Sequence, residues 1–379
     1  MRFLFYTQSL ISCWNHGNAH FLRGVMRELK ALGHEAIALE PENSWTRTRL
    51  VADQGSAAVA RFWRDFPDLT VRVYGPRFRH EEMLDTADVV VVHEWTDPTL
   101  VARIGRARAN GGRFTLLFHD THHRAVSAET EIAALKLKDY DCVLAFGEAL
   151  RQRYLRAGWG HQVVTWHEAA DTHLFRPMPD VERTKDLVWI GNWGDDERSA
   201  EIEAFLVEPA WRLKLTGTVR GVRYPPEALA ALRLTRLHYG GWIANADAPA
   251  AFARHRVTVH IPRRPYVKAL PGIPTIRMFE ALACGIPLIS APWDDEEGLF
   301  RPGRDFLFAR TGEEMTRLMH ELLGDEDWRS DIAASGLDTI MARHTCLHRA
   351  NELLDVVAAC GVPGARHARR AGSRAEAAE

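Results

Sequence analysis

Residues 3–40, FLFYTQSLISCWNHGNAHFLRGVMRELKALGHEAIALE, decide the fold class of this chain. The stretch begins with one short apolar run and ends with another, EAIALE at 35–40. Between the two runs, apolar residues recur at helical spacing, and Gly33 follows them as a helix stop. The apolar positions of this helix are Phe21, Leu22, Val25, Met26, Leu29 and Leu32. The stretch therefore predicts a strand, a helix and a second strand parallel to the first.

The same alternation of strand and helix runs through the rest of the chain. Continuous apolar runs, such as the four valines at 89–92, are typical of parallel strands covered on both faces. The first series of predicted strands covers 3–6, 35–40, 71–75, 88–94, 113–120, 142–147 and 162–168. The second series covers 186–192, 212–217, 236–241, 257–262, 287–292 and 305–310. We therefore predict an α/β protein with two doubly wound, Rossmann-like domains that face a cleft.

Composition places the domain boundaries. We predict an N-terminal domain at 1–170, a linker rich in proline and charge at 171–185, and a second domain at 186–345. Residues 346–361 are predicted to form a C-terminal helix that packs back toward the N-terminal domain. Residues 362–379 lack an apolar period and are predicted to be a disordered tail.

Composition also excludes several classes of protein. Of the 379 residues, 46% are hydrophobic and 26% charged, and the net charge of −2 gives no basic surplus for nucleic acid. The five cysteines show no C-x-x-C spacing, so we predict neither a disulfide framework nor a zinc site. The N-terminus does not resemble a signal peptide, and no apolar run is long enough for a transmembrane segment. We therefore expect a cytoplasmic protein.

Polar residues gather in the loops that follow the predicted strands. Ligands of doubly wound sheets bind at the carboxyl ends of the strands, so these loops are the candidate sites. In the first domain they hold His16, Gly17 and Asn18, then His93 and Glu94, then the segment 119–124. The adjacent His122 and His123 are not predicted to bind a metal, because neighbouring side chains on an extended segment point in opposite directions.

The stretch PGIPTIRMFEALACGIPLIS, 271–290, carries two charges in an otherwise apolar helix. Thr275 is predicted to cap a helix that begins near Ile276, which leaves free N–H groups for an anion. Arg277 in the first turn suits a phosphate, and Glu280 lies on the same face, where its carboxylate matches the two hydroxyls of a ribose. The alternative is a surface ion pair worth only ~0.2–0.5 kcal/mol. The apolar surroundings of Glu280 favour the ligand role.

This stretch resembles the signature of the GT-B-fold glycosyltransferases of the "glycosyl transferases group 1" type, in a branch that reads G-x-P-x-x-R-x-F-E-A-L-A-C-G-x-P-x-I. Three further segments are similar to segments of the same family and occur in the same order. They are GNAHFLRGVMRELKALGHE at 17–35, HEAADTHLFRP at 167–177 and WIGNWGDDER at 189–198. The resemblance spans nearly the whole chain.

The resemblance implies a hexosyltransferase-like enzyme that moves a sugar from a nucleoside-diphosphate sugar to an unknown acceptor. It implies retention of configuration, with no metal and no other cofactor. The expected contacts are Gly17 and Asn18 with the diphosphate, the His119 loop with the transferred sugar, Gly241, Trp242 and Ile243 with the base, Glu280 with the ribose, and Gly272, Ile273, Thr275 and Ile276 with the diphosphate and sugar.

The sequence departs from the family pattern at two places. The family's E-x7-E pair has its first glutamate where this chain has Gly272. The arginine and lysine that commonly follow the first strand of the second domain are here Asn192 and, one place off, Arg198. The phosphate charge could then be met by Arg277, Arg263, Arg264 or Lys268.

The roles of several residues stay open at the level of sequence. Arg277 is the candidate for stabilising the leaving diphosphate. If the reaction were inverting, a general base would be needed, and His16, Glu94, His119 and Asp120 are the candidates. Trp242 could stack on the base or pack at a domain edge. Trp14, Trp95 and Trp293 could line an acceptor site or serve as packing residues.

Two other functions are compatible with the architecture. One is a sugar-nucleotide epimerase of the same fold, and the other is a non-catalytic, two-lobed protein that binds a sugar or nucleotide. A redox enzyme with a dinucleotide cofactor is disfavoured, because no G-x-G-x-x-G follows a predicted strand.

Overall fold

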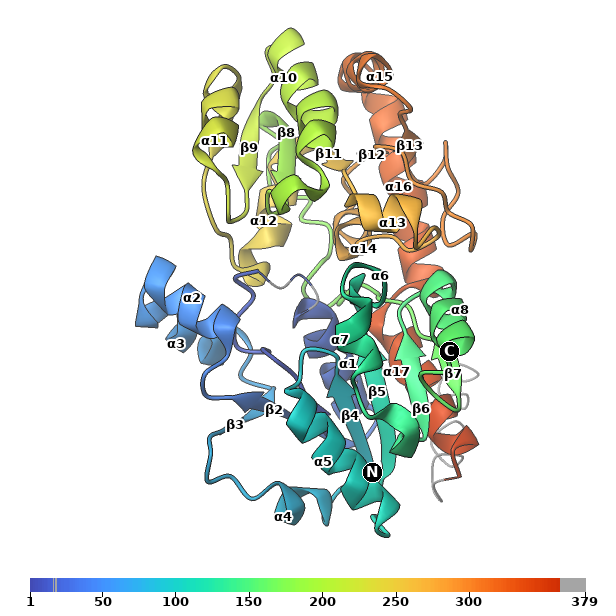
Figure 1. Cartoon of the computed structure of the whole chain (residues 1–379). Coiled ribbons are helices and arrows are strands. Elements are labelled where there is room, and N and C mark those ends of the chain that lie inside the picture. The colour runs from blue at the N-terminus through green and yellow to red at the C-terminus, as the bar shows by residue number, and fades with distance from the viewer. Residues whose placement is uncertain (16, 18, 362–379) are drawn as a thin grey trace, which may run out of the picture. The chain divides into compact units, whose positions relative to one another are not determined.

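The computed structural model describes residues 1–15, 17 and 19–361, and it divides into two compact units (Figure 1). Unit 1 consists of Met1–Ser12, Leu22–Glu168 and the chain from Cys346 onward. Unit 2 consists of Cys13–Phe21 and Ala169–Thr345. The short segment Cys13–Phe21 follows the first strand of unit 1, yet it groups with unit 2. The predicted tail, 362–379, lies outside the described residues.

Unit 1 is built on a seven-stranded sheet in which every pair of neighbouring strands is parallel. The spatial order is β3-β2-β1-β4-β5-β6-β7. The central strands β1, β4 and β5 are almost fully buried, which explains their continuous apolar runs. The strands are β1 (Arg2–Tyr6), β2 (Glu35–Pro41), β3 (Thr70–Tyr74), β4 (Val89–His93), β5 (Thr115–Asp120), β6 (Cys142–Ala145) and β7 (Val163–Thr165).

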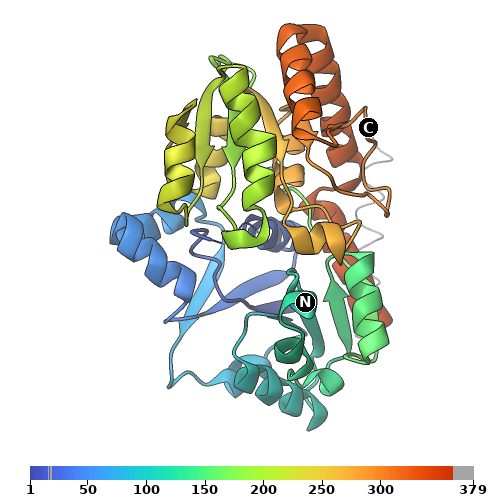
Figure 2. The same ribbon diagram turned by 45° about the horizontal axis from the view of Figure 1, so that its top comes forward.

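Helices connect the strands of unit 1. The first of them, α1 (Ala19–Ala31), buries five of its six predicted apolar positions, and Gly33 follows it with a φ of 83°. The others are α2 (Trp45–Gln54), α3 (Ser56–Asp65), α4 (His80–Leu84), α5 (Pro98–Ala109), α6 (Arg124–Ser127), α7 (Glu129–Ala133), the 3₁₀ turn η1 (Leu137–Asp139), α8 (Glu148–Ala157) and the C-terminal α17 (Cys346–Ala359). Helices α2 and α3 pack against each other (Figure 2).

Unit 2 is built on a six-stranded parallel sheet in the order β10-β9-β8-β11-β12-β13. Its strands are β8 (Lys185–Ile190), β9 (Thr216–Arg220), β10 (Arg236–Tyr239), β11 (His255–His260), β12 (Leu288–Ser290) and β13 (Leu307–Phe308). Its helices are η2 (Asp195–Glu197), α9 (Ser199–Ile202), the π-helical turn η3 (Glu203–Val207), α10 (Glu208–Arg212), α11 (Pro226–Arg233), η4 (Asn245–Asp247), α12 (Ala248–Ala253), α13 (Arg264–Lys268), α14 (Ile276–Ala283), α15 (Gly312–Gly324) and α16 (Glu326–Arg343).

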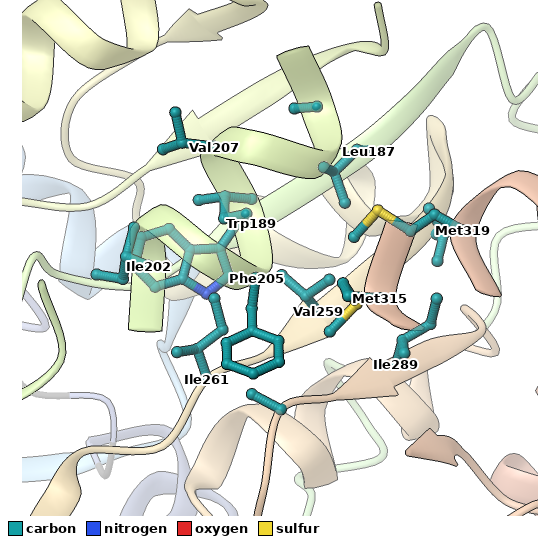
Figure 3. Packing of buried hydrophobic residues seen from close by; sticks show 14 of the residues in the cluster. Leu187, Trp189, Ile202, Phe205, Val207, Val259, Ile261, Ile289, Met315 and Met319 are labelled. Carbon is teal, nitrogen blue, oxygen red and sulfur yellow. The ribbon is translucent and has the colours of Figure 1, made fainter. Parts of the chain in front are cut away.

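One hydrophobic cluster of unit 2 lies between its sheet and helices that include α15 (Figure 3). Met315 and Met319 of α15 pack toward Ile289 of β12 and Leu187 of β8. The unbranched methionine side chains suit the irregular space beside branched strand residues. Burial of this apolar surface is the main free energy that holds the sheet and helices of the unit together.

The structure confirms the predicted fold class of two doubly wound α/β domains. One strand is displaced: the run predicted as a strand at 212–217 straddles a helix end, and the strand itself is β9 at Thr216–Arg220. Arg212 still belongs to α10, and Lys214 has a φ of 54°, which an extended strand does not allow. Within that run Leu215 is buried and Leu213 is partly buried, because both close the end of the helix onto the core.

No helix in the described part of the chain is long and apolar enough to cross a membrane.

Candidate functional site

In unit 2, the order of the strands reverses between β8 and β11, and polar loops follow both strands at that point. A ligand of a doubly wound sheet is expected beside such a switch point. The predicted donor-side residues Asn192 and Arg263 follow these two strands directly. Arg198 follows a few residues later and starts the helical segment from α9 onward.

The side chain of Arg198 ties the two switch-point loops together. It is buried and donates hydrogen bonds to the carbonyl oxygens of Asn192 at 2.5 Å and Ile261 at 2.7 Å. Its guanidinium also lies 5.2 Å from the ring centroid of Trp189. Burial, and then the charge of nearby Arg263, lower the pKa of Arg198 to about 9. Arg198 therefore holds the loops in place with its donors already engaged.

Two other predicted phosphate ligands are engaged in ion pairs. Arg263 Nη1 lies 2.7 Å from Glu197 Oε2, and Arg264 Nε lies 3.1 Å from Glu201 Oε1. Both arginines are partly exposed. A phosphate would have to compete with these carboxylates for either guanidinium.

Helix α14 begins at Ile276, as the sequence predicts, but Thr275 does not cap it with its side chain. Thr275 occupies the N-cap position with extended backbone angles, and its carbonyl accepts from the Met278 N–H at 3.0 Å. The prediction that its hydroxyl caps the helix is therefore wrong. The first-turn N–H groups keep no side-chain partner from Thr275, which leaves this helix end suited to an anion.

Glu280 is fully buried and has charged or polar neighbours on both carboxylate oxygens. Oε1 lies 2.7 Å from Nδ1 of His20, which is also fully buried, and Oε2 accepts a hydrogen bond from Arg277. Burial raises the pKa of Glu280, but the charge of Arg277 and the contact with His20 outweigh it, so the pKa lies below its ordinary value. The side chain of Arg277 keeps 26% of its surface exposed. The ion pair between Arg277 and Glu280 is therefore half-buried, unlike an ordinary surface ion pair.

His20 is the site residue that the sequence did not single out. It lies in α1, about 260 positions from Glu280, so no local spacing relates the two. Its other ring nitrogen, Nε2, is buried without a hydrogen-bond partner, and its ring lies 4.6 Å from that of Phe175. The one available signal was its place within the quoted segment 17–35.

The segment Cys13–Phe21 contacts the same loops of unit 2. Asn15 accepts a hydrogen bond from the Asn192 side chain at 2.6 Å. A Cβ added at Gly17 would lie 2.8 Å from Cγ2 of Ile276, so glycine permits the close approach to α14. The structure therefore brings predicted Gly17 and Asn192 together with α14. The predicted residues His16 and Asn18 lie outside the described residues.

Gly272 and Ile273 belong to a loop that is tied to the segment after β12. The Gly272 N–H donates to the carbonyl of Asp294 at 2.8 Å, and the Trp293 indole donates to the carbonyl of Ile273 at 3.0 Å. Trp293 is therefore a buried packing residue. A Cβ at Gly272 would lie 3.2 Å from Cγ and 3.4 Å from Oε1 of Glu297. A carboxylate from another loop thus stands beside the position where the family pattern has glutamate.

The predicted base-binding segment follows β10. Gly241 has a φ of 64°, and its carbonyl accepts from the N–H of Gly221. Trp242 and Ile243 are partly buried. The indole N–H of Trp242 is buried and has no hydrogen-bond partner among the described residues.

In unit 1, the predicted residues Glu94, His119 and Asp120 meet at the ends of β4 and β5, and all three are buried. Asp120 accepts hydrogen bonds from the hydroxyl of Tyr154 at 2.6 Å and from the N–H of His122 at 3.0 Å.

Glu94 and Asp120 form a buried pair of carboxyl groups. Burial, and then the neighbouring Asp120, raise the pKa of Glu94 well above its ordinary value, and burial raises the pKa of Asp120 to about 6. Two carboxylates in contact disfavour a second negative charge. Arg124 lies 3.4 Å from Glu94 and partly compensates the charge. The folded protein therefore favours one shared proton over two negative charges in this pair.

The ring centroids of His122 and His123 lie only 4.0 Å apart. The premise that these side chains point in opposite directions is wrong, because the segment turns into α6 at this point and is not extended. In the part of the chain that the structure describes, no group of three or more histidine, cysteine, aspartate or glutamate side chains is placed to hold a metal ion.

Comparisons with known proteins agree with this geometry. Residues 198–355 match the model of a family described as glycosyl transferase-like. Among solved structures, sucrose-phosphate synthase from Thermosynechococcus elongatus has 14% identity and a TM-score of 0.66, over 94% of this chain and 98% of that one. HepE from Anabaena, in complex with UDP and glucose, has 15% identity and a TM-score of 0.66, over 94% and 99%.

A third structure, alpha-glucosyltransferase in complex with UDP, has 11% identity and a TM-score of 0.67, over 94% of this chain and 99% of that one. No curated protein sequence matches this chain. The fold is that of the GT-B structures. Residues 198–355 therefore resemble the glycosyl transferase-like family, which confirms the resemblance seen in the sequence, and the chain has the GT-B fold.

Proposed function

We propose that this protein transfers a hexose from a nucleoside-diphosphate sugar to an acceptor hydroxyl, with retention of configuration and without a metal ion. The observation that carries the proposal is the cluster of Arg277, Glu280 and His20 at the start of α14, beside the switch-point loops of unit 2. Helix-end N–H groups and a partly exposed arginine suit a diphosphate.

The cluster also supports an order of events on donor binding. Arg277 reaches solvent, whereas Glu280 does not. We propose that the diphosphate draws Arg277 toward itself and thereby releases Glu280 Oε2 for the ribose hydroxyls. Oε1 meanwhile stays against His20, which fixes the carboxylate.

In the transfer step, negative charge builds up on the diphosphate as the sugar leaves it. The bond between the anomeric carbon and the diphosphate oxygen breaks, with its electron pair going to the phosphate. The acceptor oxygen forms the new bond on the same face, and its proton passes to the leaving phosphate. Arg277 and the α14 N–H groups stabilise the negative charge that develops.

The first test is binding of nucleoside diphosphates. In a panel of UDP, GDP, ADP, CDP and dTDP, we expect at least one to raise the melting temperature of the protein. UDP is tested first, because the HepE and alpha-glucosyltransferase structures are complexes with UDP. Glu280→Gln should weaken the best nucleotide about tenfold or more by calorimetry, as loss of a charged hydrogen-bond acceptor costs roughly 1.5–3 kcal/mol.

Arg317→Met is the matched control, because it removes an arginine from an exposed helical pair with Glu321 in the same unit. It should leave nucleotide affinity unchanged. If no nucleotide binds, or if Glu280→Gln binds as the wild type does, the proposal is wrong. Product anomers identified by NMR test retention, and turnover in EDTA tests independence from metal.

We further propose that Glu297 supplies the sugar-side carboxylate that Gly272 cannot. Its position beside Gly272 supports this role. Glu297→Gln should raise the KM for the sugar nucleotide about tenfold and leave the affinity for the free nucleoside diphosphate unchanged, because only the sugar hydroxyls lose an acceptor. Glu321→Gln is the control, because Glu321 is an exposed residue of α15. An equal loss of affinity for sugar nucleotide and free nucleotide would contradict the assignment.

A further inference from the structure

A hollow of about 640 Å³ lies at the amino edge of the unit 2 sheet, the edge opposite the switch-point loops. It lies where two helices end and two neighbouring strands begin. Helix α10 ends at Arg212 before β9, and α11 ends at Arg233 before β10. Because β9 and β10 are parallel, with Arg236 opposite Thr216, both connections reach the same edge. We call this hollow the amino-edge pocket.

Two large apolar side chains line the amino-edge pocket and are nevertheless exposed. Trp211 has 59% of its surface exposed, and Leu234 has 75%. These are the highest values among the large hydrophobic residues that the structure describes, and Met341 follows with 53%. Exposed apolar residues that lie together mark interaction sites, since their contact with water is unfavourable. The two side chains therefore indicate a partner that covers them.

The charge of the amino-edge pocket is positive. Lys214 and Arg236 line it, and both are exposed. Neither has an ion-pair partner among the described residues. Arg212 lines the pocket too, but it is paired with Glu208 at 2.5 Å. No acidic residue is among the described residues at the pocket, although the whole chain has a net charge of −2. The local surplus favours a partner that carries carboxylates.

The backbone at Lys214 adopts a conformation that favours glycine. Its φ is 54°, in the left-handed region. The N–H of Lys214 donates to the Trp211 carbonyl at 3.3 Å, and the N–H of Leu215 donates to the Ala210 carbonyl at 3.0 Å. These bonds form a Schellman motif, in which the left-handed residue is usually glycine. The strain of a side chain at this position favours a role for the ammonium group beyond folding.

An extended protein segment fits the amino-edge pocket better than a lipid surface does. The hollow between Trp211 and Leu234 suits an inserted side chain, whereas a lipid surface would contact a convex face. Strand β10, which begins at Arg236 in the pocket, is the last strand of the sheet and pairs only with β9 among the described strands. Its outer edge leaves backbone groups for a further extended chain.

We propose that the amino-edge pocket docks an acidic segment of another protein. An aromatic or leucine side chain of that segment lies between Trp211 and Leu234, and carboxylates lie on Lys214 and Arg236. Apolar burial supplies most of the affinity, and the charges supply selectivity. The docked segment leaves the carboxyl edge of the unit 2 sheet open. This assignment does not depend on the proposed function.

Selection of a random dodecapeptide library on the full chain tests the assignment. The enriched peptides should carry net negative charge and a tryptophan, phenylalanine or leucine. The most enriched peptide, labelled with fluorescein, should bind in an anisotropy titration. Trp211→Ala and Arg236→Gln should each weaken it about tenfold or more. Trp63→Ala is the matched control and should bind as the wild type does, because Trp63 is 45% exposed but does not line the pocket.

Lys214→Gly separates docking from a structural role. Glycine suits the backbone at this position, so the melting temperature should rise by about 2 °C, while the affinity for the peptide should fall about tenfold. A fall in both would show that the lysine serves the fold, and would contradict its assigned role.

Three other results would overturn the assignment. The first is that no acidic peptide is enriched, or that Trp63→Ala weakens binding as much as Trp211→Ala. The second is that phosphatidylserine vesicles bind the protein more tightly than the peptide does and lose this binding in Trp211→Ala. The third is that light scattering shows a dimer that Trp211→Ala dissociates, because the pocket would then be covered by a second copy of the chain.

Discussion

Glu94 and Asp120 show how two residues can make the stability of unit 1 depend on pH. Both carboxyl groups have pKa values raised by burial, that of Asp120 to about 6. The folded state therefore binds more protons than the unfolded state once the pH exceeds the ordinary carboxyl range. The contribution of Asp120 is fully present below the ordinary carboxyl range and is lost as the pH rises through about 6, and the raised pKa of Glu94 adds a loss in the same direction.

Glu94→Gln should flatten this dependence. With Glu94 replaced by an amide, only one of the two carboxyl groups with a raised pKa remains, so the fall in stability between pH 5 and pH 7.5 should be about halved. Urea unfolding at several pH values measures it. Glu131→Gln is the control, because Glu131 is an exposed partner of the same Arg124. Parallel curves for wild type and Glu94→Gln would rule the shared proton out.

Helices α14 and α15 each have a threonine at the N-cap position, but only one of the two threonines caps its helix with the side chain. Thr311 accepts a hydrogen bond from the N–H of Glu314 and caps α15, whereas Thr275 makes no such bond at the start of α14. Helix α14 is held mainly by burial, since seven of its eight residues are buried.

The two threonines should therefore respond differently to substitution. Thr311→Ala should lower the free energy of unfolding by about 1 kcal/mol, the usual loss for a cap. Thr275→Ala should cost less than about 0.5 kcal/mol, because no cap is lost. Chemical denaturation of both variants measures the difference. A larger loss for Thr275→Ala than for Thr311→Ala would contradict the geometry.

At the scale of the whole molecule, unit 1 is completed by the C-terminal helix. Helix α17 lies in unit 1, although more than 170 residues of unit 2 separate it from the rest of that unit. The Trp166 indole donates to the carbonyl of Arg349 at 2.9 Å, which fixes α17 beside the end of β7. Unit 1 therefore depends on both ends of the described chain.

Leu353→Ala should weaken unit 1 in particular. Leu353 is fully buried in α17, and its truncation should cost about 2–5 kcal/mol. Hydrogen exchange should show lost protection in β6 and β7 and little change in β8 to β12. Leu347→Ala, an exposed position on the same helix, should change neither. Lost protection confined to unit 2 would show that α17 supports the other unit instead.

The sequence alone determined the two parallel sheets, because the patterns that predict them are local. Residues 89–92 show the continuous apolar run of a strand buried on both faces, and residues 3–40 show the helical period between two strands. It also located α14 and its charges, since Arg277 and Glu280 are one turn apart. It misjudged Thr275, because capping depends on a side-chain rotation that no local sequence pattern records.

Only the tertiary structure decided which groups meet. It placed His20 against Glu280, Glu297 beside Gly272, and Trp211 and Leu234 in one pocket. It also showed that Arg198 donates hydrogen bonds to the carbonyl oxygens of two loops. These contacts join residues far apart in the chain, and they arise because parallel strands bring distant loops to one edge of a sheet. Periodicity carries no information about such contacts, since it records burial and not partners.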